Sequence, residues 1–294
     1  MWIGAHVSTR GGLFGAIDSA RACGAEAAQI WGSNPRAWAH PSVSRSRAEE
    51  FGKEWREAGF GPLFMHSPYM VNVASPNAGF RRRSVELATA TVELAEVIGA
   101  QGVVVHAGSA GVGTDPRGGL EGAAHSLVQI AGAANRTRVL VELTAGGAGS
   151  VASTFPQART LFEAAGWDDR LALCADTCHL FAAGYALDDP AGVEACFGQL
   201  RRVGMARRLG LVHANDSRFP KGSHRDSHTH IGQGLIGAIG FAAILAQPAV
   251  RRCAVICETP GRTEERAQDI ATLRRLAGLQ GPRASGVANL VRTQ

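Results

Sequence analysis

Short apolar runs alternate with longer stretches of helical periodicity along most of the chain. The apolar runs have the length and composition of buried strands. Eight of them can be marked, at Trp2–Ala5, Ala27–Trp31, Leu63–Met65, Val103–Val105, Val139–Val141, Leu171–Ala175, Leu209–Val212 and Ala254–Cys257. Each is followed by a stretch in which apolar residues recur with the spacing of a helix, and this regular alternation is the first indication of the fold.

The helical stretches complete eight strand–helix units. They are predicted at Gly12–Cys23, Ser44–Ala58, Ser84–Ile98, Leu120–Ala134, Pro156–Ala165, Pro190–Val203, Leu235–Leu245 and Arg262–Leu276. Eight alternations of strand and helix are typical of an α/β protein built as a single (β/α)8 TIM barrel. We predict one such domain over residues 1–281, with residues 282–294 as a flexible C-terminal tail.

The charge balance is basic but not strongly patterned. The chain of 294 residues carries a formal net charge of +5, and Lys53 and Lys221 are its only lysines. A basic chain suits a polyanionic partner such as nucleic acid. The arginine clusters are nevertheless scattered along the sequence and are interpreted as solvated helix faces, at Arg81–Arg83, Arg201/Arg202, Arg207/Arg208 and Arg251/Arg252.

The six cysteines do not indicate a disulfide framework or a metal site. The pairs Cys174/Cys178 and Cys253/Cys257 have C-x3-C spacing and stand in or beside apolar runs, which favours packing over metal binding. No signal peptide or apolar run of transmembrane length is recognised. We expect a cytoplasmic protein without a membrane partner.

Polar residues with metal-binding side chains stand where the predicted strands end. They are His66, His106, Glu142, Asp176 with His179, His213 and Glu258. The carboxyl ends of barrel strands converge on one face, which is where the active sites of such barrels lie. We therefore expect these residues to meet although they are far apart in the sequence.

A polar loop after the seventh strand adds further candidates. The segment from His213 to Gly232, HANDSRFPKGSHRDSHTHIG, contains four of the ten histidines, and Asp226 and His228 stand in D-x-H spacing. Buried carboxylates are costly unless they are paired or bound to metal. Imidazoles mixed with carboxylates and without thiolates suit zinc, with manganese or iron as alternatives. The nine candidates are enough for three zinc ions if carboxylates bridge.

Several motifs together resemble the endonuclease IV family of trinuclear-zinc apurinic/apyrimidinic endonucleases. The motifs are IGAHVSTRGGL, HSPYMVN, DTCHLFAAGY, HANDS, the D-x-H-x-H-I-G sequence from Asp226 to Gly232, and CETP, in order from Ile3 to about Leu276. The resemblance implies a DNA-repair endonuclease that cleaves the phosphodiester 5′ to an abasic site. The products would be a 3′-hydroxyl and a 5′-deoxyribose phosphate, and cleaning of blocked 3′ ends is also implied.

The resemblance also implies a ligand set. One zinc falls to His66 and His106, a second to Asp176, His213 and Glu258, and a third to His179, Asp226 and His228, with the Glu142 carboxylate bridging the first two. A metal-bound hydroxide would then replace any side-chain nucleophile. His6 carries no ligand role and is interpreted as a residue that supports the ligands or packs beside them. His230 is interpreted as a hydrogen-bonding neighbour of the ligands, with direct metal ligation as the alternative, and His224 as a solvated loop residue.

The implied partner is double-stranded DNA with abasic sites or blocked 3′ ends, bound by a monomer. Arg36 in GSNPRAW and Tyr69 and Met70 in HSPYMVN match family positions that enter the duplex, although Tyr69 and Met70 could instead cap the barrel. The chain departs from the family pattern at three positions that bear on DNA contact: Leu143, where Asn is common; Ser227, where Arg is usual; and Gln233, where an acid is frequent.

Two other functions are compatible with parts of this pattern. A xylose-isomerase-like sugar isomerase or epimerase also gathers His, Asp and Glu at barrel strand ends, but it usually needs fewer metals. A non-catalytic, metal-stabilised DNA-binding module would not need three open metal sites. The D-x-H pair and the third set of ligands therefore favour the nuclease.

Overall fold

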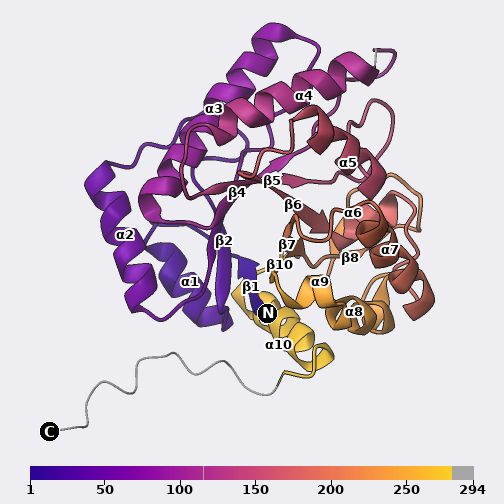
Figure 1. Ribbon diagram of the computed structural model, residues 1–294. Helices are drawn as coiled ribbons and strands as arrows, with labels where there is room; N and C mark the ends of the chain where they lie inside the picture. Colours follow the sequence, from indigo (N-terminus) through magenta and orange to yellow (C-terminus); the bar gives the residue numbers. More distant parts are fainter. Residues whose placement is uncertain (115, 280–294) are drawn as a thin grey trace, which may run out of the picture.

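The computed structural model describes residues 1–114 and 116–279 and contains a closed barrel of eight parallel strands (Figure 1). The strands are β1 (Trp2–His6), β2 (Ala27–Trp31), β3 (Leu63–His66), β4 (Gly102–His106), β5 (Arg138–Glu142), β6 (Leu171–Asp176), β7 (Leu209–His213) and β10 (Ala254–Cys257). Their order around the barrel is β1-β10-β7-β6-β5-β4-β3-β2. The predicted tail, residues 282–294, lies outside the described residues.

Helices surround the barrel, and the predicted (β/α)8 fold is confirmed. The longer ones are α1 (Gly15–Cys23), α2 (Arg45–Glu57), α3 (Ala78–Ile98), α4 (Pro116–Ala131), α5 (Phe155–Ala164), α7 (Pro190–Arg202), α8 (Gly237–Ala246) and α10 (Thr263–Leu276). All eight predicted strands and all eight predicted helices correspond to one of these elements.

The main differences from the prediction are small elements and one helix start. Helix α3 begins at Ala78 rather than Ser84, because the Asn77 side chain caps it by accepting a hydrogen bond from the Phe80 amide at 2.9 Å. The structure also contains two short helices, α6 (Thr177–Ala182) and α9 (Pro248–Arg251), and a two-stranded antiparallel sheet of β8 (Asp216–Ser217) and β9 (His228–Thr229). None of these was predicted.

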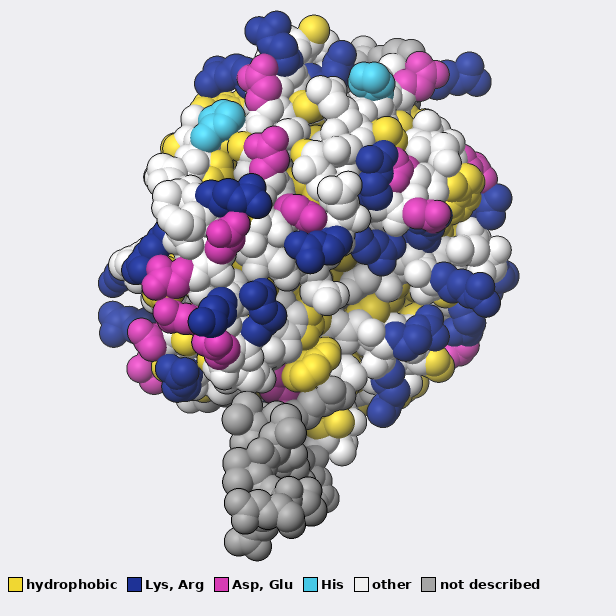
Figure 2. Space-filling model, turned by 60° about the vertical axis from the view of Figure 1, so that its left-hand side comes forward, with side chains coloured by type: hydrophobic (Ala, Val, Ile, Leu, Met, Phe, Trp, Pro, Cys, Tyr) yellow, Lys and Arg dark blue, Asp and Glu magenta, His cyan; other side chains and the backbone are white. Residues whose placement is uncertain are grey.

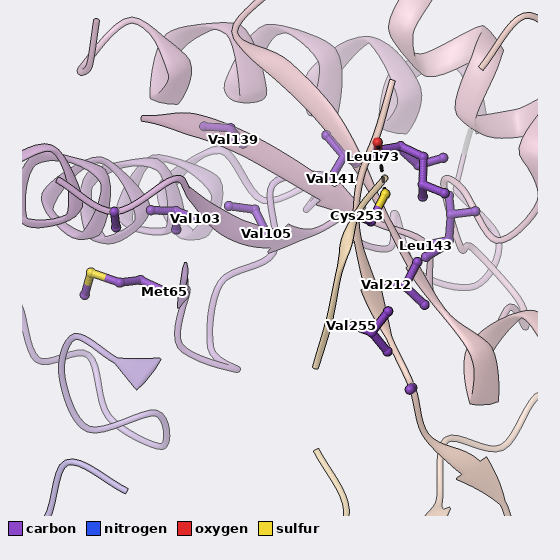
Figure 3. Close-up of a cluster of buried hydrophobic side chains, with 14 of the residues drawn as sticks. Met65, Val103, Val105, Val139, Val141, Leu143, Leu173, Val212, Cys253 and Val255 are labelled. Carbon is purple, nitrogen blue, oxygen red and sulfur yellow. Dashed lines mark hydrogen bonds between the residues drawn. The ribbon is translucent and has the colours of Figure 1, made fainter. Parts of the chain in front are cut away.

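Alternation along the strands divides the core into two layers. Side chains such as Val103, Val105 and Val141 belong to the large cluster between barrel and helices, part of which Figure 3 shows. Their neighbours Val104 and Leu140 belong to a smaller cluster inside the barrel. Because side chains of a strand alternate between faces, the last residues of β4 and β5 also point inward.

The outer surface is polar, and its charges are mostly mixed. Figure 2 shows basic and acidic side chains alternating over the left half of one face. Exposed pairs such as Arg45–Glu49 on α2 and Arg82–Glu86 on α3 are of the i,i+4 type. None of the helices in the described part of the chain is long and apolar enough to span a bilayer.

Candidate metal centre

The carboxyl ends of the strands carry the candidate ligands into one cavity. His66, His106, Glu142, Asp176 and His213 are the last residues of β3 to β7 in turn, and Glu258 directly follows β10. The cavity at this end has a volume of about 640 Å³ and is lined by His66, His106, Glu142, His179, Asp226, His228 and Glu258, among others. Asp176 and His213 lie fully buried beneath it.

A short helix places His179. Asp176 ends β6 and caps α6, with its Oδ1 accepting a hydrogen bond from the His179 amide at 2.9 Å. His179 therefore stands in the first turn of α6 and not on a strand. Its Nδ1 donates to the Leu143 carbonyl at 2.9 Å, which leaves Nε2 directed toward Asp226.

The polar segment His213–Gly232, here called the arm, is anchored by the buried Asp216. Its carboxylate accepts hydrogen bonds from five backbone amides, those of Ser217, Gly232, Gly234, Ile236 and Gly237. A Cβ atom at Gly234 would lie 2.5 Å from Asp216 Oδ1, so the close approach requires glycine there. Because both ends of the arm are tied to one carboxylate, Asp226 and His228 are held over the cavity.

The nine predicted ligands fall into three groups, and Glu142 belongs to two of them. Within each group the candidate ligand atoms lie within 4.8 Å of one another, and the groups are His66/His106/Glu142, Glu142/Asp176/His213/Glu258 and His179/Asp226/His228. Glu142 Oε2 lies 3.1 Å from His66 Nε2 and 3.2 Å from His106 Nε2, whereas Oε1 lies 3.0 Å from His213 Nδ1. The two oxygens of this carboxylate thus face different groups.

The electrostatics of the site are dominated by close carboxylates. Burial alone would lower the pKa of His228, but Asp176 and Asp226 outweigh it and raise the pKa to about 9. Burial would also lower the pKa of His179, but the carboxylates of Asp176, Asp226 and Glu142 raise it well above its usual value. Burial would raise the pKa of Glu142, but His213 and His106 hold it well below its usual range. The site therefore favours bound positive charge.

The environment of two histidine nitrogens indicates whether the residues of the site fit a metal ion. His179 Nε2 and His228 Nε2 are buried and make no hydrogen bond in the described structure. They nevertheless lie 3.2 Å and 3.1 Å from the two oxygens of Asp226, without the geometry of a hydrogen bond. Two nitrogens and a carboxylate that converge without bonding one another are the donor set of a divalent cation, so the residues present fit a metal ion.

Two buried amides that the sequence reasoning missed orient the candidate ligands. Gln29 on β2 accepts from His213 Nε2 through its Oε1 at 2.9 Å and donates from Nε2 to Glu258 Oε1 at 2.6 Å. Asn215 donates to Asp176 Oδ2 at 2.6 Å and accepts from the Glu258 amide at 2.8 Å. A lone glutamine inside the apolar run AAQIW was the signal for the first, and the HAND motif for the second.

The predicted DNA-contact residues lie on two adjoining loops beside the cavity. The Tyr69 amide donates to the Pro35 carbonyl at 3.0 Å, which joins the two loops. Tyr69 is 59% exposed, and its ring centroid lies 4.8 Å from that of Trp31. Arg36 is exposed and Met70 is half-buried. Tyr69 and Trp31 both line the cavity.

Of three further histidines, His6 contacts a candidate ligand, whereas His230 and His224 bond to other residues. His6 Nδ1 lies 2.9 Å from Glu258 Oε1, and His230 Nδ1 lies 2.9 Å from Asp269 Oδ2. His224 is exposed, has a φ of 55°, and its Nδ1 bonds the Ala145 carbonyl at 3.1 Å.

The cysteines and the three departures from the family pattern occupy distinct environments. Cys174 Sγ lies within 4.8 Å of ligand atoms of Glu142 and His213, and Cys178 Sγ within 4.8 Å of those of Asp176 and His228. Burial raises the pKa of both thiols to about 12. Leu143 is buried in the core, Ser227 lines the cavity, and the Gln233 amide donates to the His230 carbonyl at 3.0 Å.

Comparison with known proteins identifies the family. Residues 17–276 match the family model described as a xylose isomerase-like TIM barrel. A protein of Streptomyces coelicolor named "Probable endonuclease 4" is 36% identical over 278 residues, which cover 93% of this chain and 94% of the relative.

Superposition on solved structures distinguishes relatives of this chain from proteins that share only its fold. Endonuclease IV from Thermus thermophilus superimposes with a TM-score of 0.82 at 33% identity and covers 95% of this chain and 99% of that one. A 3-keto-D-glucoside 4-epimerase from E. coli superimposes with a TM-score of 0.68 at 16% identity, covering 94% of this chain and 99% of that one, which shows a shared fold alone. The chain therefore belongs to the xylose isomerase-like TIM barrel family and, within it, to the endonuclease IV proteins.

Proposed function

We propose that this protein is a zinc-dependent endonuclease of DNA repair. It hydrolyses the phosphodiester 5′ to an abasic site, leaves a 3′-hydroxyl and a 5′-deoxyribose phosphate, and also removes blocked 3′ ends. The observation that carries the proposal is the convergence of nine imidazole and carboxylate side chains into three groups, two of which share Glu142. The names of its relatives support the choice of DNA as substrate.

The ligand roles follow the three groups. His66 and His106 would hold one zinc, Asp176, His213 and Glu258 a second, and His179, Asp226 and His228 a third, and Glu142, whose two oxygens face the first two groups, would serve both. Bound zinc ions lower the pKa of water toward neutrality and stabilise negative charge on an attacked phosphate and its leaving oxygen. The buried carboxylates keep these cations in place.

The cavity has no lysine that could act as a nucleophile among the residues that line it. The two lysines of the chain, Lys53 and Lys221, are both exposed, and neither lines the cavity. A lyase that forms a Schiff base needs a lysine amine within reach of the sugar. Hydrolysis by water therefore fits the cavity better than a covalent route.

Recognition of the lesion is assigned to the two loops that Tyr69 and Pro35 join. An exposed aromatic ring beside a site that accepts an extruded nucleotide can offset the cost of unstacking, and a missing base makes that extrusion easier. Tyr69 and Met70 supply the wedge. Arg36 contacts the phosphate backbone, and its contribution falls as salt rises.

A sugar isomerase or epimerase is the principal alternative, because that class shares the fold. Such an enzyme has no evident use for the group His179/Asp226/His228, which the arm contributes in part. Assays with an abasic duplex and with a panel of ketoses and aldoses separate the two functions.

The first test is incision of a duplex that contains a tetrahydrofuran analogue of an abasic site. The wild-type protein should nick 5′ to the analogue and leave an end that a polymerase extends, and chelation should abolish the nick. Glu142→Ala should lose incision because it separates the two joined sites. His224→Asn is the matched control, since asparagine tolerates the positive φ at that exposed position, and it should incise like the wild type.

Other outcomes of this assay are informative. A 3′ end that a polymerase cannot extend, or a covalent adduct trapped by borohydride on a natural abasic site, would indicate a lyase. Equal loss of activity in Glu142→Ala and His224→Asn would mean that the arm has been misinterpreted.

The second test separates recognition from hydrolysis. The double variant Tyr69→Ala/Met70→Ala should bind abasic duplex roughly 10-fold to 100-fold more weakly, about 1.4–2.8 kcal/mol, because it lacks the wedge. Its metal content should not change. Ile239→Ala on α8 removes another exposed apolar side chain and should bind like the wild type. Wild-type affinity and incision in the double variant would place lesion recognition elsewhere.

The third test concerns Gln29, which fixes the orientation of His213 and Glu258. Gln29→Leu keeps the volume of the side chain but removes both hydrogen bonds, so metal affinity should fall about 10-fold to 100-fold. The measurement is the rate at which a chromogenic chelator extracts zinc. Thr91→Val, which removes one buried hydrogen bond on α3, is the control and should release zinc at the wild-type rate. Equal release from both variants would remove Gln29 from the metal centre.

A further inference from the structure

A basic hollow lies on the rim of the barrel opposite the metal centre. It has a volume of about 520 Å³ and is lined by Arg201, Ala206, Arg207, Pro248, Ala249 and Arg252. Arg207 precedes β7, and Arg252 precedes β10, whereas His213 and Glu258 stand at the other ends of the same strands. At about 3.3 Å per residue, the six residues from Arg207 to His213 separate the hollow from the metal site by on the order of 20 Å.

The fold assembles this hollow from arginine clusters that are far apart in the sequence. The clusters Arg201/Arg202, Arg207/Arg208 and Arg251/Arg252 each contribute one lining residue. The sequence alone indicated scattered, solvated arginines. The parallel barrel brings them together because the ends of α7 and α9 and the starts of β7 and β10 share one rim.

The arginines at this rim differ in what they contact. Arg208 faces the protein, with bonds to the Trp167 and Asp168 carbonyls and an ion pair with Asp169. Arg207 is exposed and has no ion pair or side-chain hydrogen bond within the described part of the chain. Structural anchoring therefore explains Arg208 but leaves Arg207 without a role.

The other two lining arginines are held in position. Arg201 is paired with Glu194, and Arg252 Nη2 donates to the Ala206 carbonyl at 3.4 Å. Arginine in the last turn of a helix also interacts favourably with the helix dipole, which accounts in part for Arg201. Arg207 belongs to no helix, so the dipole does not account for it. The hollow combines two oriented guanidinium groups with one unpaired group.

The charge at the hollow is less balanced than at the ion pairs on α2 and α3. Exposed Arg45 and Arg82 each have a glutamate one turn away, and Figure 2 shows the same alternation over the left half of its face. At the hollow, Glu194 is the one carboxylate that pairs with a lining arginine among the described residues. Neighbouring positive charges that outnumber the carboxylates paired with them attract a polyanion.

We propose that this hollow is a second site for the DNA backbone, which binds undamaged duplex without sequence preference while the metal face engages the lesion. The proposal rests on the proposed function, because DNA is the polyanion that the enzyme meets. Arginine suits this role, since its planar guanidinium matches a phosphate through two parallel hydrogen bonds. A second contact raises the local concentration of the enzyme on DNA between encounters with lesions.

The test compares two double variants that lose the same net charge. Arg207→Gln/Arg252→Gln alters the hollow, whereas Arg45→Gln/Arg82→Gln alters paired arginines on the outer helices. Binding of a short, labelled, undamaged duplex is measured by fluorescence anisotropy over a range of salt concentrations. The slope of log affinity against log salt should fall by about 2 in the hollow variant and should not change in the control.

Further measurements distinguish the possible failures. Zinc content and incision of abasic duplex at low salt should be the same in both variants and the wild type. If the proposed function is wrong, the wild type itself will not incise abasic duplex, whatever the hollow variant does. If the hollow variant does not fold, Arg207→Gln alone, which breaks no described contact, should lower the slope by about 1.

Two results would overturn the proposal. One is an unchanged affinity and slope for undamaged duplex in the hollow variant. The other is a competition result: polyglutamate of equal charge displaces the labelled duplex from the wild type as effectively as unlabelled duplex does, and it no longer does so in the hollow variant. The second result would assign the hollow to an acidic protein partner.

Discussion

The structure depends on how it neutralises four carboxylates gathered at one end of a barrel. Glu142, Asp176 and Glu258 belong to one group of potential ligands, and Asp226 completes another. Glu142 and Asp176 are buried, where an ionised carboxylate is costly without a partner of opposite charge. The imidazoles around them satisfy this need if they carry protons, or they provide neutral nitrogen ligands if metal ions carry the charge. The unbonded nitrogens of His179 and His228 favour the second arrangement.

The barrel holds this costly arrangement by simple geometry. Strand residues alternate between the helix layer and the interior, so one inward position at each strand end faces the cavity. Gln29 and Asn215 then orient the ligands through hydrogen bonds, and Asp216 ties both ends of the arm to the barrel. The hydrophobic layer between strands and helices makes the strand ends rigid. The hydrophobic layer can therefore hold the polar cluster together even if the cluster adds nothing to the free energy of unfolding.

The fold was predictable because it follows from repeated local patterns. Eight apolar runs and eight helical stretches sufficed, and the candidate ligands at the strand ends could be found from their positions alone. Elements shorter than two helical turns were missed. Helix α6 contains TCHLFA, whose six buried residues show no exposed face, and β8 and β9 are two residues each. The start of α3 was hidden by the run Arg81–Arg83, which has no apolar periodicity.

Contacts between distant residues were less accessible to sequence reasoning. Gln29 had no evident role until β2 was placed beside β1, which brings it next to His6 and Glu258. The hollow at the opposite rim likewise exists only after the barrel closes, since each arginine cluster was predicted from the sequence as a solvated helix face. Long-range pairing, rather than composition, decides which polar residues meet.

Three metal ions are expected to compensate the charge of this cluster. Elemental analysis of protein purified without chelator tests this expectation most directly, because each of the three groups offers three or four ligands. About three zinc ions per chain are expected. One metal ion per chain, or none in protein that still incises abasic duplex, would contradict it.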